Sequence, residues 1–190
     1  MYILNKKSKG SGNIFVLSCM FALVICLIAS AVFRANVMNA VAQGIQDDLI
    51  LSSSTVYKYI DPRVLGEDEP MLLITDYSAA YNEVKKYLIN NMKLNENMEP
   101  RDNGIIKSPI EITDFIIYNY KGESVDIITY NNGAFTVDSK NTLNEDIITK
   151  NEHKVNSTVV TTTISMDVKG IYGVIERQSV SVDTDIIIGN

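Results

Sequence analysis

Few side chains in this 190-residue chain are of the kinds that carry out chemistry. The single histidine, His153, lies in a polar stretch, which disfavours both a histidine-rich metal site and a Ser-His-Asp triad. Both cysteines, Cys19 and Cys26, lie inside an apolar run, so no thiol nucleophile or paired-cysteine zinc site is expected outside that run. No glycine-rich phosphate loop is present. The sequence therefore predicts that the protein is not an enzyme and that it uses no cofactor and no metal.

Acidic residues offer two weaker candidates. Asp183 and Asp185 lie two apart on a predicted strand and share one of its faces, where they could form a carboxylate pair. An exposed strand face explains them more simply. Glu67, Asp68 and Glu69 form an acidic cluster, but calcium would need further oxygen ligands at spaced positions. We expect a solvated loop there.

The strongest signal is the apolar run 14–33, IFVLSCMFALVICLIASAVF, which has no charge between Lys9 and Arg34. As a helix it would be about 30 Å long, the thickness of the hydrocarbon core of a bilayer. A lone segment in lipid must satisfy its own backbone groups, and only a helix does so. The sequence predicts one transmembrane segment over 14–33.

The charge distribution predicts how this segment is oriented. Residues 1–13 hold three lysines and no acid, whereas the rest of the chain holds the other 14 of 17 basic residues against all 23 acidic ones. A basic segment before a span favours a cytoplasmic N-terminus. We therefore expect a single-pass protein of the cytoplasmic membrane with its C-terminal part outside. That acidic part argues against nucleic acid as a partner, and no small-molecule substrate is evident.

The helical pattern continues past Arg34. Apolar residues recur every four positions, and no proline occurs before Pro62. The chain therefore predicts one helix over 14–60, about 70 Å long, apolar all round over 14–33 and amphipathic over 34–60. The recurring residues are Phe33, Val37, Val41, Ile45 and Leu49.

Three fates are open for this N-terminal segment. It can remain as a permanent span, or it can be a secretory signal cleaved after Ala31, since Ala29-Ser30-Ala31 fits the cleavage pattern. A signal peptide does not need the helix to continue, so this second fate is disfavoured. In the third, the basic leader 1–13 is clipped after Gly10 or Gly12.

The remainder, 61–190, predicts an outer domain of the α+β class. A second helix begins at Asp76, which can cap it, and ends near Met92. Residues 93–108 and 139–156 read as connections, the latter as a loop or a short helix. Short β-favouring runs then predict a meander, followed by two longer strands. These runs are 115–120, 125–130, 135–138, 159–168 and 174–188.

In the two longer runs, apolar and polar residues alternate, as in Ile164, Ser165 and Met166. Such alternation is typical of antiparallel strands with one face buried and one face wet. The apolar stripe of an amphipathic helix and the apolar face of such a sheet can bury each other. We therefore expect the helix over 37–60 to lie across the apolar face of the sheet.

The leader 6–12, the span 14–33 and the polar and small continuation 34–41 together resemble the N-terminus of type IV pilin-type subunits. Among these, the chain is most similar to TadE-like minor pilins and pseudopilins of bacterial tight-adherence pilus loci. The resemblance implies a pilin-like fold, in which apolar half-helices bundle and the globular parts face outward. Small residues permit such close approach in a bundle. The expected helix-packing residues are Ala22, Ala29, Ser30, Ala31, Val37, Val41 and Ile45.

One departure from the family concerns charge. Its members usually carry a glutamate near the start of the apolar helix, whereas here Asn13 stands at that start and the first acid is Asp47. This favours a minor subunit, one that primes or assembles a bacterial surface filament or secretion machine. Its expected partners are membrane lipid, other pilin-like subunits or assembly-platform membrane proteins. The alternative is a membrane-tethered binding, adhesion or accessory domain that does not polymerise.

Overall fold

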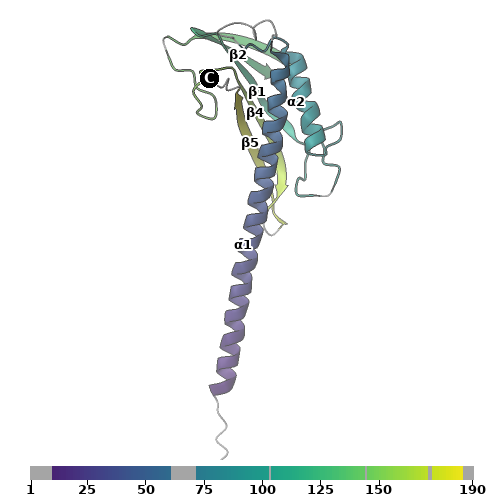
Figure 1. Ribbon diagram of the computed structural model, residues 1–190. Coiled ribbons are helices and arrows are strands. Elements are labelled where there is room, and N and C mark those ends of the chain that lie inside the picture. The colour runs from purple at the N-terminus through teal and green to yellow at the C-terminus, as the bar shows by residue number, and fades with distance from the viewer. Residues whose placement is uncertain (1–9, 61–71, 103, 144, 171–172, 186–190) are drawn as a thin grey trace, which may run out of the picture. The chain divides into compact units, whose positions relative to one another are not determined.

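The computed structural model describes residues 10–60, 72–102, 104–143, 145–170 and 173–185. These residues contain two α-helices, one short 3₁₀ helix and five strands, which is the α+β layout that the sequence predicts (Figure 1). The chain divides into two compact units, Met1–Val41 and Ala42–Asn190, and we call the second the head. In order, the elements are α1 (Gly10–Ser54), η1 (Thr55–Tyr59), α2 (Tyr77–Asn91), β1 (Glu111–Tyr120), β2 (Ser124–Asn131), β3 (Ala134–Asn141), β4 (Val159–Lys169) and β5 (Ile175–Asp185).

Helix α1 runs without a break from Gly10 to Ser54, so the predicted continuous helix is confirmed up to its last turn. That turn, η1, is a 3₁₀ helix. A run of hydroxyl residues precedes it, and Ser52 Oγ and Ser54 Oγ each donate a hydrogen bond to the carbonyl oxygen four residues earlier. Such back-bonding loosens an α-helix, and helices commonly tighten to 3₁₀ geometry at this end. The predicted stop at Asp61-Pro62 lies outside the described residues.

Helix α2 begins as predicted at Asp76, whose side chain accepts a hydrogen bond from the backbone N–H of Ala79 at 2.9 Å. This bond satisfies one of the amide groups that a helix leaves free at its N-terminus. Its buried side chains, Ala80, Val84 and Leu88, recur every four residues and form the inner face.

The five strands form one antiparallel sheet in the order β3-β2-β1-β4-β5. The predicted meander is β1-β2-β3. Its second turn is Asn132-Gly133, where both residues have positive φ, as a two-residue hairpin turn requires. β4 then returns beside β1, and β5 lies at the edge.

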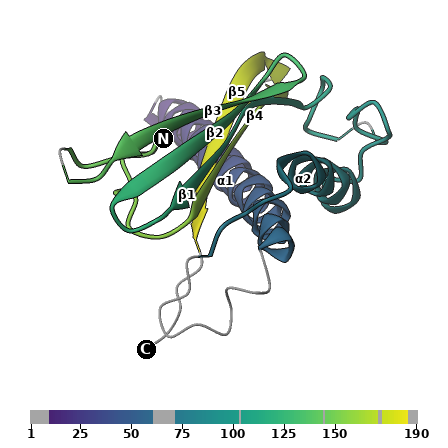
Figure 2. The ribbon, with the colours of Figure 1, turned by 90° about the horizontal axis from the view of Figure 1, so that it is seen from above.

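Within the head, the last part of α1 and the helix α2 cover the same face of the sheet (Figure 2). Leu49 and Val56 of this part of the chain are fully buried. Ser53 Oγ donates a hydrogen bond to Thr162 Oγ1 on β4 at 2.7 Å, and the Tyr57 hydroxyl donates to the carbonyl oxygen of Thr184 on β5. From Ala42 onward, the expected packing of the helix across the sheet is confirmed.

The prediction of one wet face was wrong for β4, whose residues 159–166 are buried on both sides. Residues 145–158, which precede β4 and which we call the covering segment, cover the second face. There Ile147 and Val155 pack against Ile116, Tyr118 and Val159. Hydroxyl side chains can be buried on β4 because they find hydrogen-bond partners there. This covering segment holds no helix in its described part, and the bridge between Ile148 and Lys154 shapes it instead.

Aromatic contacts hold α2 on the sheet and predict an alkaline transition. The ring of Tyr81 stacks on Tyr130 at 4.1 Å between centroids, and burial together with Tyr130 raises the pKa of Tyr81 to about 12. In the unfolded chain this phenol ionises near pH 10. Unfolding therefore releases a proton between about pH 10 and about pH 12, and the free energy of unfolding falls as the pH rises through this window. Below it, the contribution is fully present.

We expect Tyr81→Phe to reduce that fall, since phenylalanine cannot ionise. The measurement is urea unfolding of the full-length protein in detergent at pH values across the window. Tyr87→Phe, which alters an exposed tyrosine of the same helix, is the control. An equal fall for Tyr81→Phe and the unaltered protein would contradict the prediction.

Candidate functional site

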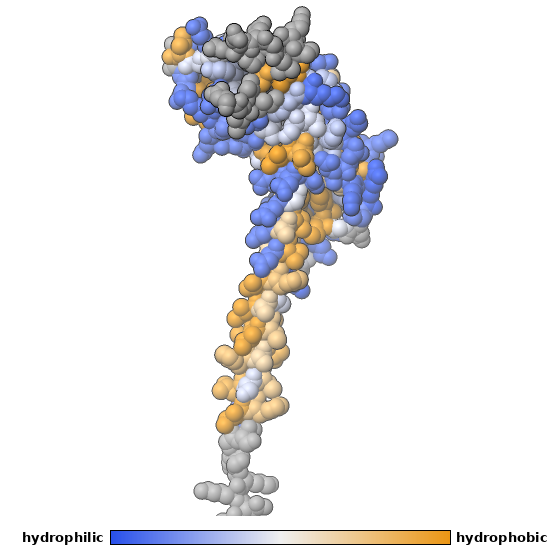
Figure 3. All heavy atoms as spheres, in the orientation of Figure 1, coloured by the Kyte–Doolittle hydropathy of each residue, from blue (hydrophilic) through white to orange (hydrophobic). Residues whose placement is uncertain are grey.

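Two surfaces are candidates for function. The first is the apolar helix surface, by which we mean residues 14–33 of α1 (Figure 3). It has no charged residue, and its large apolar side chains are exposed. They are Ile14, Phe15, Val16, Leu17, Met20, Phe21, Leu23, Val24, Ile25, Leu27, Ile28, Val32 and Phe33.

The apolar helix surface suits a bilayer. In the part of the chain that the structure describes, α1 is the one helix long and apolar enough to cross a membrane. Its two serine hydroxyls are satisfied within the helix, because Ser18 Oγ donates to the carbonyl of Ile14 at 2.9 Å and Ser30 Oγ to that of Leu27 at 3.0 Å. No polar side chain of this segment therefore needs water.

The predicted helix-packing residues divide between the two units. Ala22, Ala29 and Ser30 are exposed on the apolar helix surface, whereas Ile45 is buried in the head. Ile45 therefore contributes to the packing of the head and is not available to another subunit. Ala31 and Val41 are partly buried, and Val37 is exposed.

The predicted leader ends where α1 begins. Gly10 is the first residue of the helix, and Gly12 lies within its first turn. Residues 1–9 lie outside the described residues. Cleavage after either glycine would leave the apolar helix at the new N-terminus.

A stripe of small residues runs along the apolar helix surface, formed by Cys19, Ala22, Cys26 and Ala29. Their separations of three and four residues place them on one helix face. Both cysteines are exposed and form no disulfide. Small side chains let two helix backbones approach closely in a membrane. The predicted helix-packing residues include the two alanines but not the two cysteines, although the heptad spacing of each pair is visible in the sequence.

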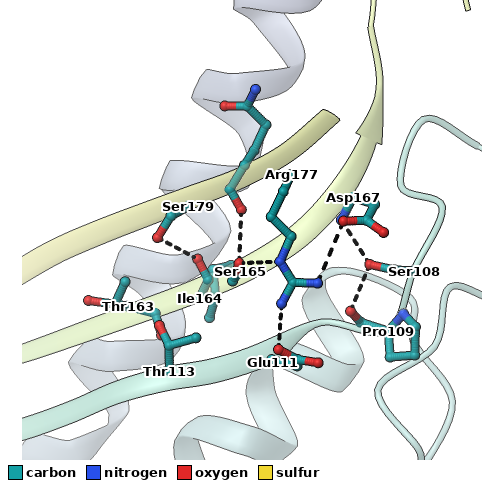
Figure 4. A network of polar contacts seen from close by, with 11 residues as sticks. Ser108, Pro109, Glu111, Thr113, Thr163, Ile164, Ser165, Asp167, Arg177 and Ser179 are labelled. Atoms are coloured by element: carbon teal, nitrogen blue, oxygen red, sulfur yellow. Dashed lines mark hydrogen bonds and ion pairs between the residues drawn. The ribbon is translucent and has the colours of Figure 1, made fainter. Parts of the chain in front are cut away.

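The second surface is a polar cluster around Arg177 on the other face of the sheet (Figure 4). The guanidinium joins three strands, because Nε donates to Ser165 Oγ at 2.8 Å on β4 and Nη2 donates to Glu111 Oε2 at 2.5 Å on β1. Nη1 lies 3.5 Å from Asp167 Oδ1. With two carboxylates beside it, Arg177 is neutralised and holds the strands together; it does not offer an anion site.

Asp183 has a structural role of the same kind. Its carboxylate accepts hydrogen bonds from Thr149 Oγ1 at 2.5 Å, Thr161 Oγ1 at 2.6 Å and Asn151 Nδ2 at 2.8 Å. These bonds tie the covering segment to β4 and β5, and nearby Asp185 is exposed. The predicted carboxylate pair therefore has one member occupied by structural hydrogen bonds.

Other candidate residues are placed as follows. His153 is exposed in a turn, where its backbone N–H donates to Thr149 Oγ1 at 3.2 Å. The acidic cluster of Glu67, Asp68 and Glu69 lies outside the described residues. Among the described residues, no three His, Cys, Asp or Glu side chains are grouped as metal ligands.

No protein-family model, no curated protein and no solved structure matches this chain.

Proposed function

We propose that the chain is a pilin-like minor subunit, which uses the apolar helix surface to join other helices and so helps to prime or assemble a bacterial surface filament or secretion machine. One observation carries this proposal. The helix that bears the apolar helix surface is the same unbroken helix that supplies Leu49 to the core of the head. Anchor and head are thus built on one element.

A plain tether would not need this construction. The chain between Phe33 and Ile45 is helical throughout and holds no proline, whereas tethers are commonly rich in glycine, serine or proline. An exposed apolar helix is stable in lipid or against other apolar helices, and the small-residue stripe suits the second environment. The basic leader supports an orientation with the N-terminus in the cytoplasm and the head outside. The partners are then membrane lipid and other pilin-like subunits or assembly-platform proteins.

The absence of any acid before Asp47 is also consistent with a second candidate. The pilin-like family that the chain resembles usually carries a glutamate near the start of the apolar helix. A chain without it can act as a membrane-tethered binding or accessory domain that never polymerises. Both candidates need the span, but only the first needs contact between helices.

The experiment that separates them is the intact mass of the protein recovered from cells, measured in the membrane fraction and in the sheared surface fraction. A processed subunit loses residues 1–10 or 1–12 and is found in the sheared fraction. Full-length protein confined to the membrane supports the tethered domain. Loss of residues 1–31 would contradict both.

The native cysteines test helix contact directly. If α1 helices meet through the small-residue stripe, a mild oxidant such as copper phenanthroline should convert full-length protein in membranes to a disulfide-linked dimer, because a disulfide needs Cα atoms within about 7 Å. Cys19→Ser combined with Cys26→Ser should abolish the dimer. The matched control adds Val24→Cys to that double variant, which moves a thiol to another face of the same helix. Equal cross-linking from Val24→Cys and from the native cysteines would show random collision.

A further inference from the structure

The end of the β4–β5 hairpin carries exposed apolar side chains. Val174 is 54% exposed and Ile175, at the start of β5, is 59% exposed. The β5 residues that follow, up to Ser179, are exposed as well. Hairpin ends that face water are normally polar. Two neighbouring β-branched apolar residues at this position therefore suggest an apolar partner.

The hairpin points toward the N-terminal end of the head part of α1. Ser53 Oγ donates to Thr162 Oγ1, and one turn later the Tyr57 hydroxyl donates to the carbonyl of Thr158 at 3.4 Å. The contacts therefore move toward the N-terminal end of β4 as α1 and η1 proceed toward their C-terminal end, which means that the helix and β4 run in opposite directions. Beyond Thr162, β4 therefore runs toward the end of the head where the chain enters it at Ala42.

The lengths of the two elements show that the hairpin reaches that end. From Thr162 to Lys169, β4 extends about 23 Å. From Ser53 back to Ala42, the helix covers about 17 Å. Nine residues then separate Ala42 from Phe33, about 14 Å as a helix and at most about 32 Å as any chain. The end of the hairpin thus lies at the end of the head where α1 enters it, and the chain that leads from there to the apolar helix surface is only nine residues long.

The Arg177 cluster keeps the hairpin extended. Arg177, the third residue of β5, joins this strand to Ser165 on β4 and to Glu111 on β1. The loop before β1 adds backbone hydrogen bonds from Lys107 N–H to the Asp167 carbonyl at 2.7 Å and from Lys169 N–H to the Ile105 carbonyl at 2.8 Å. These bonds brace β4 up to its last residue, Lys169, and β5 at Arg177, two residues after Ile175.

We propose that the end of the β4–β5 hairpin inserts Val174 and Ile175 into the interfacial region of the bilayer that holds the apolar helix surface. Lipid is the partner because the chain is already bound to that apolar phase, and the headgroup region extends several Å beyond the hydrocarbon core. Lys169 pairs with Ile175 across the hairpin and is exposed, so its ammonium can reach lipid phosphates while its stem lies along apolar atoms. This second membrane contact orients the head on the membrane. It rests on the span and does not require polymerisation.

The absence of tryptophan from the chain allows a direct test. Full-length Val174→Trp is reconstituted in phosphatidylcholine vesicles with and without a lipid brominated near the headgroup end of its acyl chains. We expect a blue-shifted emission that the brominated lipid quenches. Val137→Trp is the matched control, because Val137 is 57% exposed on the opposite edge strand, β3. It should be neither shifted nor quenched, since pairing across the sheet places it level with Val160, beside Tyr57 and away from the hairpin end.

Two further variants make each outcome decisive. Val24→Trp, in the middle of the apolar helix surface, reports the span itself and is measured with a lipid brominated near the methyl end of its acyl chains. Quenching of Val24→Trp without quenching of Val174→Trp overturns the hairpin contact and leaves the proposed function standing, whereas loss of both overturns both. A blue shift at position 174 without quenching means burial against protein, such as a second copy, and also overturns the contact. Ile175→Trp should give the same shift and quenching as Val174→Trp, which shows that the result does not depend on a local distortion caused by one substitution.

Discussion

Replacing Phe115 with alanine is expected to lower the free energy of unfolding of the head by about 3–5 kcal/mol, the range for deleting a buried phenylalanine ring. Phe115 is fully buried on β1, a central strand of the sheet. Its ring forms a T-shaped pair with the ring of Tyr81 from α2, with 5.4 Å between centroids, so the substitution removes packing between the sheet and the helix layer. Since most domains are stable by about 5–15 kcal/mol, this loss would leave a marginal head.

The measurement is urea unfolding of the full-length protein in detergent, followed by circular dichroism. Phe33→Ala is the matched control, because Phe33 is 70% exposed on the apolar helix surface. It removes the same ring and should leave the stability of the head unchanged. Similar losses for the two variants would mean that the head does not depend on the Phe115 core.

Replacing Ala29 with leucine is expected to abolish incorporation of the chain into an assembly while leaving the head folded. Ala29 lies on the small-residue stripe and is exposed. A larger side chain at a close helix contact costs about 1–3 kcal/mol, and 1.4 kcal/mol already lowers an association constant tenfold. Contacts repeated along a bundle multiply that effect.

The readout is the amount of protein in the sheared surface fraction, together with the yield of the native cysteine cross-link. Ala29→Ser keeps the residue small and should retain both signals. Val37→Asp tests the same lateral packing by placing a charge on the exposed continuation of the helix. Full incorporation of Ala29→Leu and Val37→Asp would rule out packing through this side of α1, and would favour the tethered domain.

Much of the fold could be predicted because its signals are local. The apolar run and the four-residue recurrence that follows it define α1, Asp76 caps α2, and Asn132-Gly133 marks a hairpin. Each of these features is decided by residues within a few positions of one another. The small-residue stripe is equally local, because separations of three and four residues within one helix define it.

The buried second face of β4 could not be predicted in this way. Thr161 and Thr163 read as a wet face, because threonine is usually exposed. They are buried because partners from elsewhere in the chain satisfy their hydroxyls, Asp183 for the first and Ser181 for the second. The Arg177 cluster likewise depends on the pairing of β1, β4 and β5, and on a register shift between Ile112 and Asp114. Such pairing is a property of the assembled sheet.

The contacts between α1 and the last two strands also determine when the head can fold. Ser53 meets its partner Thr162 after a separation of 109 residues, and Tyr57 meets Thr184 after 127. During synthesis, Leu49 and Val56 therefore emerge long before the strands that will bury them. Such distant pairings also slow folding. The head completes its core only when β4 and β5 have emerged, long after the whole of α1. The helix is therefore complete before the head can fold, and a chain that stops before β4 would leave Leu49 and Val56 without their cover.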